Sequence, residues 1–455
     1  MSQTKPALVM LCIAVALTLL PYPGLAGDSQ QILPMKERAE LIDTILEDRI
    51  ENLLPGLMRQ SGIDLWVIIA REYNEDPIVK TFLPATWLAA RRRTMLVIHD
   101  PGQGQPLETL AVARYNVGKQ FKQSWDPAAQ PDQWARLAEI IAERNPRHIG
   151  VNVSEGRGLA DGVSATDYRL LTENLPREFR ERLVSSEPLA VRWLETRSEL
   201  ELQHYPSIVA IAHEVIAQAF STAVVTPGET HTDDVVWWLR DRVKALGLNS
   251  WFHPTVTLQR SAVEPTHSVA APGINGVIQP GDLLHVDFGL TYLRLNTDTQ
   301  QHAYVLRPGE TSAPEFLEAA LADANRLQDL LTSEFEVGKT GNQVLAKARA
   351  NAIAEGIKPS IYSHPIGYHG HGAGTTIGMW DKQDGVPGTG DYPLHANTAY
   401  AIELNAEFYL DEWNSMVRIM LEEDALFDGS RVNYLAGRQT EFILIPGATN
   451  KGEVR

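Results

Sequence analysis

Cysteine is almost absent from this sequence. Cys12 is the only cysteine among 455 residues, and it lies in an apolar run close to the N-terminus. A chain with no other thiol forms no internal disulfide and uses no thiolate for catalysis or metal binding. Any metal site in the body of the chain therefore has to be built from His, Asp and Glu side chains.

Positive charge is also scarce. The chain has 40 Lys and Arg residues against 57 Asp and Glu residues, which gives a formal net charge of -17 at pH 7. The one short basic run is at 91–93. Nucleic-acid binding proteins carry a basic patch that neutralises phosphates. The charge therefore argues against nucleic acid as a partner.

Long hydrophobic runs are missing except at the N-terminus. Lys5 precedes an apolar run at 7–20, and Pro21 ends that run. A membrane-spanning helix needs about 20 apolar residues, so this run is too short for a stable membrane anchor. A positive charge, a short apolar run and small residues up to Ala26 are typical of a cleaved signal peptide. We predict a signal peptide at 1–26 and a secreted or periplasmic mature protein.

The length of the chain indicates more than one domain. Residues 32–195 alternate short apolar runs, typical of buried strands, with stretches of helical periodicity, so this segment is predicted to be an α/β domain. Ser198 and Glu201 have the spacing of a helix capping box, which indicates a new helix there. A second domain is therefore predicted at 198–448.

The second domain contains an internal repeat. A glycine, a threonine and a His-Pro pair recur after 110 or 111 residues, and an apolar strand with one acid follows each time. The corresponding residues are Gly228 and Gly338, Thr230 and Thr340, His253 and His364, and Asp287 and Glu403. Four such correspondences in register favour duplication of one α/β unit. The two units are predicted to face each other, with their acidic residues between them.

Two aspartates in the first unit have hairpin spacing. Asp287 stands near the end of the apolar strand at 283–288, and Asp298 follows where a return strand is expected. Residues opposite each other on neighbouring strands lie about 5 Å apart. Two buried carboxylates that close repel each other unless a proton or a cation lies between them. The pair predicts a cation site, and the competing interpretation is a turn aspartate beside a capped strand end.

The second unit offers a histidine loop and further acids. His364 begins a loop rich in glycine that also contains His369 and His371, and a neutral imidazole is a good ligand for borderline metals. Glu403 stands in an apolar strand, where a glutamate is rare unless it is paired or bound to metal. The alternative interpretations are exposed polar residues in the loop and a solvated strand end.

The last expected ligand depends on strand alternation. Apolar residues at 417, 419 and 421 share one strand face, and Glu423 continues that face. We therefore predict that Glu423, rather than Glu422, points towards the other acids.

These residues resemble a known superfamily. An Asp, a second Asp 11 residues later, a His-x-Ile-Gly-x-x-x-His motif, a strand with Glu and a final Glu-Asp pair are similar to the pita-bread metallopeptidases. This superfamily includes methionine aminopeptidase, aminopeptidase P, prolidase and creatinase. The resemblance covers roughly 198–444, and the preceding segment resembles the N-terminal domain of the creatinase branch. It implies an α/β fold, with a creatinase-type α/β domain before an α+β pita-bread catalytic domain, and a layout closest to Xaa-Pro aminopeptidase.

The resemblance also implies roles for the ligands. Two divalent metal ions would be bound, one by Asp287 and the other by His364 and Glu403. Asp298 and Glu423 would bridge both ions. Four carboxylates and one imidazole form a hard donor set that favours Mn²⁺, with Co²⁺, Fe²⁺ and Zn²⁺ as alternatives.

The implied catalytic residues are His267, His371 and Glu403. His371 matches the family histidine that contacts the scissile group. His267 matches the upstream histidine that stabilises the transition state, with His253 as the alternative because His267 lies slightly far from Asp287. A water held between the ions would attack the peptide carbonyl while Glu403 takes its proton. The implied substrate is a peptide with proline second, and the implied assembly is a homodimer.

The sequence departs from the family pattern in three features. Gln300 and Gln301 stand where arginine is frequent, Gly372 stands where an acid is usual, and Leu421 precedes Glu423 at a usual arginine position. These departures leave the substrate open. The alternatives are an Xaa-Pro dipeptidase of the prolidase type, a metal-dependent non-peptide hydrolase or lyase, and a metal-free binding module on the same scaffold.

Overall fold

The computed structural model describes residues 32–102, 104–261 and 274–447. The predicted signal peptide and His267 lie outside the described residues. Among the helices that are described, none combines the length and the apolar character needed to cross a membrane.

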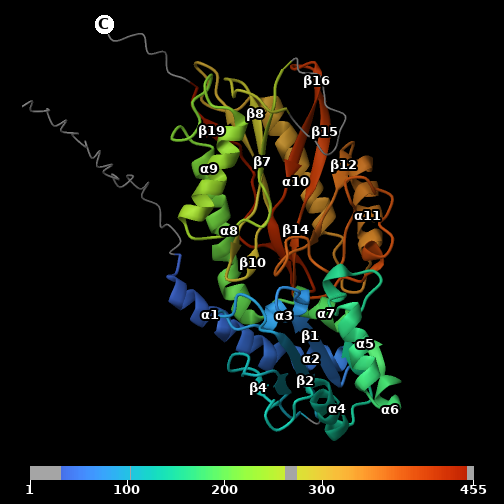
Figure 1. Ribbon diagram of the computed structural model, residues 1–455. Coiled ribbons are helices and arrows are strands. Elements are labelled where there is room, and N and C mark those ends of the chain that lie inside the picture. Colours follow the sequence, from blue (N-terminus) through green and yellow to red (C-terminus); the bar gives the residue numbers. More distant parts are fainter. Residues whose placement is uncertain (1–31, 103, 262–273, 448–455) are drawn as a thin grey trace, which may run out of the picture. The chain divides into compact units, whose positions relative to one another are not determined.

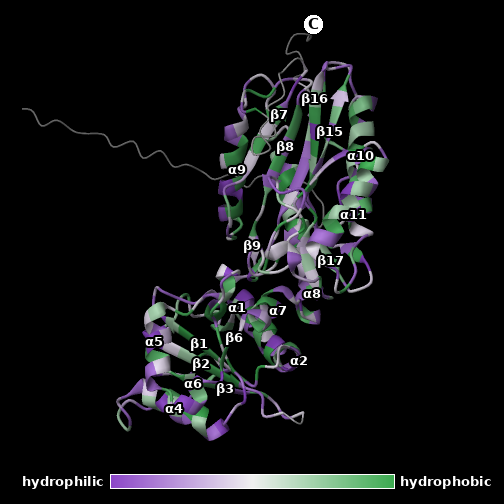
Figure 2. Cartoon of the chain, turned by 90° about the vertical axis from the view of Figure 1, so that its right-hand side faces the viewer, coloured by the Kyte–Doolittle hydropathy of each residue, from purple (hydrophilic) through white to green (hydrophobic). Residues whose placement is uncertain are grey.

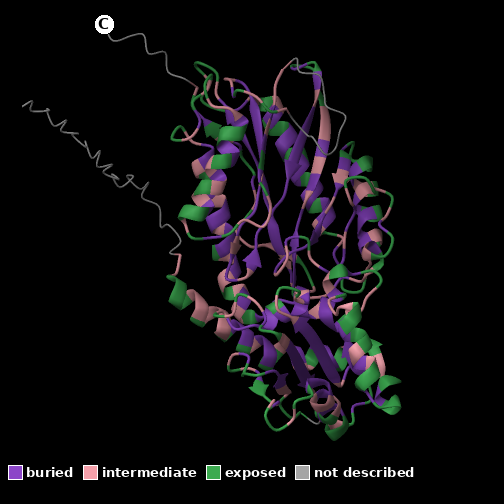
Figure 3. Ribbon diagram, viewed as in Figure 1, coloured by how far each residue is buried: buried purple, intermediate pink, exposed green. Residues whose placement is uncertain are grey.

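The first region contains a six-stranded sheet with the order β4-β3-β2-β1-β5-β6. Its strands are β1 (Leu65–Arg71), β2 (Arg93–His99), β3 (Glu108–Val112), β4 (Lys122–Gln123), β5 (Ile149–Val151) and β6 (Leu183–Ser185). β1 and β2 are buried along almost their whole length (Figure 3) and are strongly hydrophobic (Figure 2). Continuous apolar strands of this kind are covered on both faces.

Helices pack against this sheet. They are α1 (Met35–Asp48), a π-helical turn at Arg49–Leu53, α2 (Leu54–Ser61), α3 (Pro77–Phe82), α4 (Gln133–Arg144), α5 (Ala165–Asn174), α6 (Arg177–Arg180) and α7 (Glu187–Glu195), with a 3-10 turn at Gly158–Ala160. α4 begins where the Asp132 carboxylate accepts hydrogen bonds from two backbone N–H groups, and it ends at Asn145 in the left-handed conformation. Both are standard helix-boundary devices.

The second region begins with α8 (Glu199–Ala219). Its first turn has the capping box expected from the sequence: the Ser198 hydroxyl accepts from the Glu201 backbone N–H, and the Glu201 carboxylate accepts from the Ser198 backbone N–H. The buried Glu201 carboxylate also pairs with Arg49 at 2.5 Å and with Arg197 at 3.2 Å. The start of α8 is therefore fixed both locally and by a contact with the first region.

Two similar layers make up the second region. α8 and α9 (Thr232–Ala245) cover a sheet with the order β19-β11-β8-β7, and α10 (Glu315–Thr332) and α11 (Gly341–Ala354) cover a sheet with the order β12-β15-β16 (Figure 1). The first-half strands are β7 (Thr255–Gln259), β8 (Leu283–Phe288), β9 (Thr291–Tyr292), β10 (Leu295–Asn296) and β11 (Thr299–Val305). The second-half strands are β12 (Lys358–Ile361), β13 (His364–Pro365), β14 (Thr398–Ala401), β15 (Leu404–Leu410), β16 (Ser415–Leu421), β17 (Asp424–Phe427), β18 (Val432–Tyr434) and β19 (Ile443–Ile445), with a 3-10 turn at Thr389–Asp391. β13, β14, β17 and β18 form a further sheet, and β9 pairs with β10.

The turns that precede α9 and α11 have the same geometry. The Gly228 N–H donates to the Ile278 carbonyl, and the Gly338 N–H donates to the Leu394 carbonyl. The two glycines have φ of 90° and 89°, a conformation that a residue with a Cβ rarely adopts. The cap that follows differs, because His231 caps α9 whereas Thr340 caps α11. The repeated threonines are therefore not equivalent, although the turns are.

The strands of both halves have one helix-covered face and one inner face. On β8, Leu284 and Val286 pack into the core with α8 and α9, while His285 and Asp287 point the other way. This follows from the alternation of side chains along a strand.

β16 repeats this division. Its apolar residues at 417, 419 and 421 pack into the core beneath α10, so Arg418 and Met420 lie on the inner face. Gln300 and Glu422 exchange backbone hydrogen bonds of 3.0 and 3.2 Å, which joins the end of β16 to β11. Polar side chains of the two halves thus meet between the two sheets.

Candidate metal centre

Six residues that can bind metal gather between the two halves. They form three overlapping groups whose ligand atoms lie within 4.8 Å of one another. The groups are Asp287, Asp298 and Glu422; His364, Glu403 and Glu422; and Asp298, His364 and His371. Because each group shares members with the others, the residues form one continuous cluster.

The two aspartates come from the β8–β11 hairpin of the first half. Asp287 lies in β8 opposite Gln300 of β11, and Asp298 directly precedes β11. The Asp298 backbone N–H donates to the Asp424 carboxylate at 3.2–3.3 Å, which fixes the turn into the strand. The hairpin spacing seen in the sequence thus brings both carboxylates to the same group.

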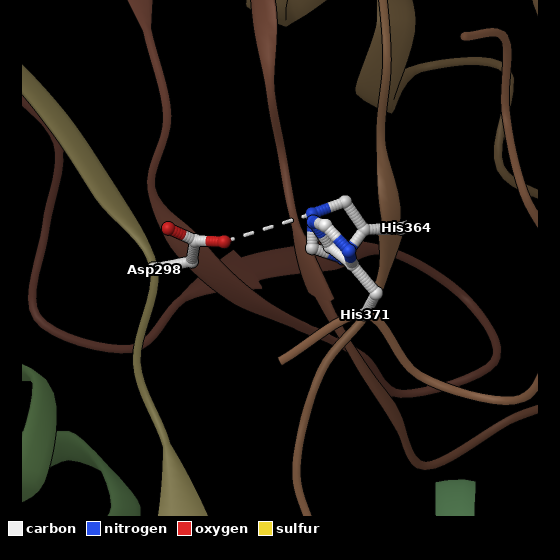
Figure 4. Close-up of side chains that lie close together, drawn as sticks. All are labelled: Asp298, His364 and His371. Carbon is white, nitrogen blue, oxygen red and sulfur yellow. Dashed lines mark ion pairs between the residues drawn. The ribbon is translucent and has the colours of Figure 1, made fainter. Parts of the chain in front are cut away.

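His364 lies in β13 of the second half, with its ring directed at the acids. Its Nδ1 lies 3.2 Å from the Pro365 carbonyl oxygen, so Nδ1 carries the proton and Nε2 keeps a free lone pair. Nε2 lies 3.7 Å from Asp298, 3.9 Å from Glu403 and 3.6 Å from Glu422, beyond hydrogen-bond range. Figure 4 shows the His364 and His371 rings turned towards Asp298. The donor atoms therefore surround a common space rather than bonding to one another.

The electrostatics of the cluster call for positive charge. Burial, followed by the charge of Glu422, raises the pKa of Asp287 and of Asp298 well above the ordinary value for aspartate. Burial raises the pKa of Glu422 to about 8 and lowers the pKa of His364 to about 4. Among the described residues, no hydrogen-bond partner exists for Oδ1 of Asp298, Oε1 of Glu422 or Nε2 of His364. Converging acids and a neutral imidazole with unpartnered buried atoms fit divalent cations.

The expectation for the last ligand is corrected, because Glu422 faces the cluster and Glu423 does not. Glu423 is fully buried, but its carboxylate lies 2.7 Å from His213 Nε2 and accepts from Gln301 Nε2 and the Gln439 backbone N–H. Alternation does place Glu423 on the face of residues 417, 419 and 421, but this apolar face of β16 is the helix-covered face. The inner face, on which Arg418 and Met420 lie, leads to Glu422.

The other predicted histidines have different positions. The His371 ring lies 4.7 Å from the His364 ring and 5.5 Å from Trp251, and partial burial lowers its pKa to about 4, so it is neutral at neutral pH. His253 is exposed, and its Nδ1 accepts from Arg240 at 3.2 Å. The structure thus brings His371 to the acids and leaves His253 out of the described cluster.

Two residues that the sequence analysis did not assign to the site support the acids. Gln300 Nε2 donates to Glu403 at 3.0 Å and to Glu422 at 2.7 Å, and its Oε1 accepts from His285 Nε2 at 2.9 Å. Gln300 stands two residues after Asp298, and His285 stands two residues before Asp287, so each shares the strand face of a predicted aspartate ligand. That spacing was a usable signal. Where the family frequently has arginine, this chain therefore has the amide of Gln300, which holds Glu403 and Glu422 of the other half.

Close packing explains the glycine after the second histidine of the motif. The Gly372 N–H donates to the Pro365 carbonyl at 2.7 Å, and a Cβ at Gly372 would lie 2.6 Å from that oxygen. A Cβ at Gly370 would lie 2.3 Å from the Trp251 ring. The acid found in the family at the Gly372 position has no room here, so this departure follows from the path of the loop.

Comparison with known proteins agrees with the fold. Residues 207–426 match the profile of metallopeptidase family M24. The X-Pro aminopeptidase of Thermotoga maritima superposes with a TM-score of 0.60 at 16% identity, over 86% of this chain and 99% of that one. The Xaa-Pro dipeptidase of Bacillus anthracis superposes with a TM-score of 0.54 at 15% identity, over 90% of this chain and 100% of that one. A variant of Escherichia coli aminopeptidase P superposes with a TM-score of 0.55 at 12% identity, over 90% of this chain and 96% of that one. No curated protein matches the sequence. The expected pita-bread fold with a preceding α/β domain is confirmed.

Proposed function

We propose that this chain, a peptidase whose residues 207–426 match metallopeptidase family M24 and whose fold is similar to that of an X-Pro aminopeptidase, removes the first residue of peptides with proline second, using two divalent ions. The observation that carries the proposal is the cluster of acids and one imidazole from both halves. Asp298, Glu422 and His364 each belong to two ligand groups, and each of the two carboxylates has an oxygen for either of two neighbouring ions, which supports a pair of ions.

Each proposed ion site draws on named side chains. Asp287 would hold one ion, and His364 with Glu403 would hold the other. Asp298 and Glu422 would contribute to both. Divalent ions bound here would supply a water of lowered pKa and polarise the substrate carbonyl. The oxygen-rich donor set supports Mn²⁺ as the preferred ion.

The surrounding residues position and protonate the reactants. Gln300 holds Oε1 of Glu403 at 3.0 Å, which leaves Oε2 free to accept a proton from the attacking water. The Glu403 side chain is 24% exposed, so substrate can reach it. His371 is neutral and exposed beside His364, and it can donate one N–H to a substrate oxygen.

The preference for proline is supported by the specificity that the names of the similar structures give for those proteins, which are Xaa-Pro peptidases. A peptide panel tests it on this chain. The Mn²⁺-loaded enzyme is expected to cleave Ala-Pro-Gly at least tenfold faster than Ala-Ala-Gly. Cleavage of the dipeptide Ala-Pro without cleavage of the tripeptide would favour the dipeptidase alternative.

Metal dependence is tested on the same substrate. Removal of metal by a chelator is expected to abolish cleavage of Ala-Pro-Gly, and Mn²⁺ is expected to restore it. Full activity of protein that is demonstrably free of metal contradicts the proposal.

Export and dimer formation are further proposals. Export is supported by the order of residues at 1–26, and N-terminal sequencing of the protein from the periplasm is expected to begin after Ala26. A homodimer is supported by the family resemblance, and light scattering is expected to give twice the mass of the mature chain.

A further inference from the structure

A small cavity opens beside the proposed metal centre. It has a volume of about 180 Å³, and Asp287 and Glu403 line it where it meets the cluster. Its walls come from β7, β8 and β11 of the first half and from β12, β15 and β16 of the second half. The metal centre and this cavity therefore share an edge, and a group bound at the metal can extend into the cavity.

A buried arginine with an unused donor lines this cavity. The Arg418 side chain is 10% exposed, and its Nη2 pairs with Glu407 at 2.5 Å. Its Nη1 is buried and has no hydrogen-bond partner among the described residues. A buried, charged donor without a partner is costly, and such atoms are frequently found where a ligand binds.

The position of Arg418 is fixed before any ligand arrives. The Gln259 side chain accepts from the Arg418 backbone N–H at 2.9 Å and donates to the Arg418 carbonyl at 2.7 Å. β15 and β16 pair Glu407 directly with Arg418. Because backbone and guanidinium are both held, little conformational freedom is lost when a ligand binds Nη1.

Arg418 is the one cation among the described residues that line the cavity, and the nearby Glu407 and Lys358 are not part of that lining. Glu407 is shared between Arg418 and Lys358, so two cations face one acid. The other acids of the cavity, Asp287 and Glu403, are taken up by metal ions under the proposed function. Neutral polar side chains complete the wall near Arg418, among them Ser360 and Asn405. An incoming carboxylate finds a cation here and no unpaired acid.

We propose that this cavity receives the side chain of the first substrate residue and that Arg418 selects a carboxylate there, so that the preferred peptides begin with Glu or Asp before proline. The volume equals that of about six water molecules, while a glutamate side chain has five non-hydrogen atoms. The cavity therefore holds one side chain and no continuing peptide. This inference rests on the proposed function, since it treats the neighbouring cluster as the site of cleavage.

Two peptides of equal size test the selectivity of the native enzyme. Glu-Pro-Gly amide is expected to have a kcat/KM at least about tenfold higher than Gln-Pro-Gly amide, because a hydrogen bond between two charged groups replaces one between the guanidinium and a neutral amide. Equal rates, or faster cleavage of the glutamine peptide, overturn the inference. The terminal carboxylate of a dipeptide is the other group that Arg418 could bind, and a comparison of Ala-Pro with Ala-Pro amide tests this. A tenfold preference for free Ala-Pro would mean that Arg418 binds the terminal carboxylate of a dipeptide.

Variants assign the selectivity to the residue. In Arg418→Met the ratio of kcat/KM for the Glu and Gln peptides is expected to fall to about one, and Arg418→Lys is expected to restore part of it. Lys358→Met is the matched control, because Lys358 pairs with the same Glu407 but does not line the cavity. A preference that survives unchanged in Arg418→Met contradicts the role of Arg418.

A binding measurement separates this inference from the proposed function. Calorimetry on the Mn²⁺-loaded protein is expected to show glutamate binding at least tenfold more tightly than glutamine, and no such difference in Arg418→Met. If this difference is found while no Xaa-Pro peptide is cleaved, the proposed function fails and only the selection of a carboxylate by Arg418 stands. If Ala-Pro-Gly is cleaved but glutamate is not preferred in either assay, only the cavity assignment fails.

Discussion

The two halves of the second region share a frame and differ in the ligands they place on it. In each half a glycine turn leads into a 14-residue helix, and that helix with its neighbour covers one face of a sheet. The first half supplies two aspartates from one hairpin, whereas the second supplies His364 and two glutamates from three separate segments. Core packing constrains the frame, and the inner faces of the strands are free to diverge.

The His-Pro pairs show this divergence most clearly. His364 is 3% exposed, with Nε2 facing three acids. His253, the histidine of the other pair, precedes β7 whereas His364 follows β12, and it is exposed and bonded to Arg240. The His-Pro pairs therefore mark different places in the two halves, although they recur 111 residues apart in the sequence.

Both halves supply proposed metal ligands, so the largest effects on activity are expected from ligand substitutions in either half. Asp298→Asn in the first half and Glu403→Gln in the second are each expected to lower kcat/KM for Ala-Pro-Gly by about 10³-fold or more, because several kcal/mol of charge stabilisation are lost. Steady-state assays with saturating Mn²⁺ check this. A variant of either half that keeps more than a tenth of the activity would mean that this half is dispensable.

The histidines of the two halves give the next effect. His371→Ala is expected to lower kcat by about 10²-fold, as is typical for loss of a group that donates to a reacting oxygen. His253→Ala serves as the matched control, and its activity is expected to change less than twofold because its ring contacts Arg240 and Trp237 at the surface. A large loss in His253→Ala would show that the halves are more alike than their geometry indicates.

A buried pair that joins the halves is expected to contribute to stability. His213 on α8 lies 2.7 Å from Glu423, which is fully buried in the second half. His213→Ala leaves Glu423 with the hydrogen bonds of Gln301 and Gln439 and is expected to cost about 1–3 kcal/mol. Urea unfolding followed by circular dichroism measures the loss. An unchanged midpoint would mean that water replaces the imidazole without cost.

The smallest effects are expected at the equivalent helix caps. Thr340→Ala removes the hydroxyl that accepts from the Gln343 backbone N–H at 3.2 Å and is expected to cost about 1 kcal/mol. His231 caps α9 through Nδ1, also at 3.2 Å, but histidine is not among the strong capping residues. His231→Ala is therefore expected to cost less than Thr340→Ala in the same unfolding assay. The reverse order would contradict the difference between the two caps.

Local patterns in the sequence predicted most of the frame. The capping box at Ser198, the buried strands and the hairpin of Asp287 and Asp298 all depend on residues close in the chain, and the structure has each of them. The superfamily resemblance supplied the order of the remaining ligands. The strands and the hairpin follow from strand periodicity, and the capping box follows from the spacing of Ser198 and Glu201.

The choice between Glu422 and Glu423 could not be made from such patterns. Both are buried, and alternation says only that they face opposite sides. Which side holds the acids depends on α10, which covers the apolar face of β16, and on His213, which lies 210 residues away in the sequence and pairs with Glu423. Burial of an acid was a sound signal of a partner, but it did not identify the partner.

Metal content of one matched pair of variants tests the central claim most directly. The native protein is expected to bind about two Mn²⁺ ions per chain, measured by elemental analysis after equilibrium dialysis. Glu422→Gln, which removes an acid shared by two ligand groups, is expected to bind fewer than one ion, whereas Glu423→Gln is expected to keep two. Retention of both ions by Glu422→Gln, or their loss from a folded Glu423→Gln protein, would contradict the account.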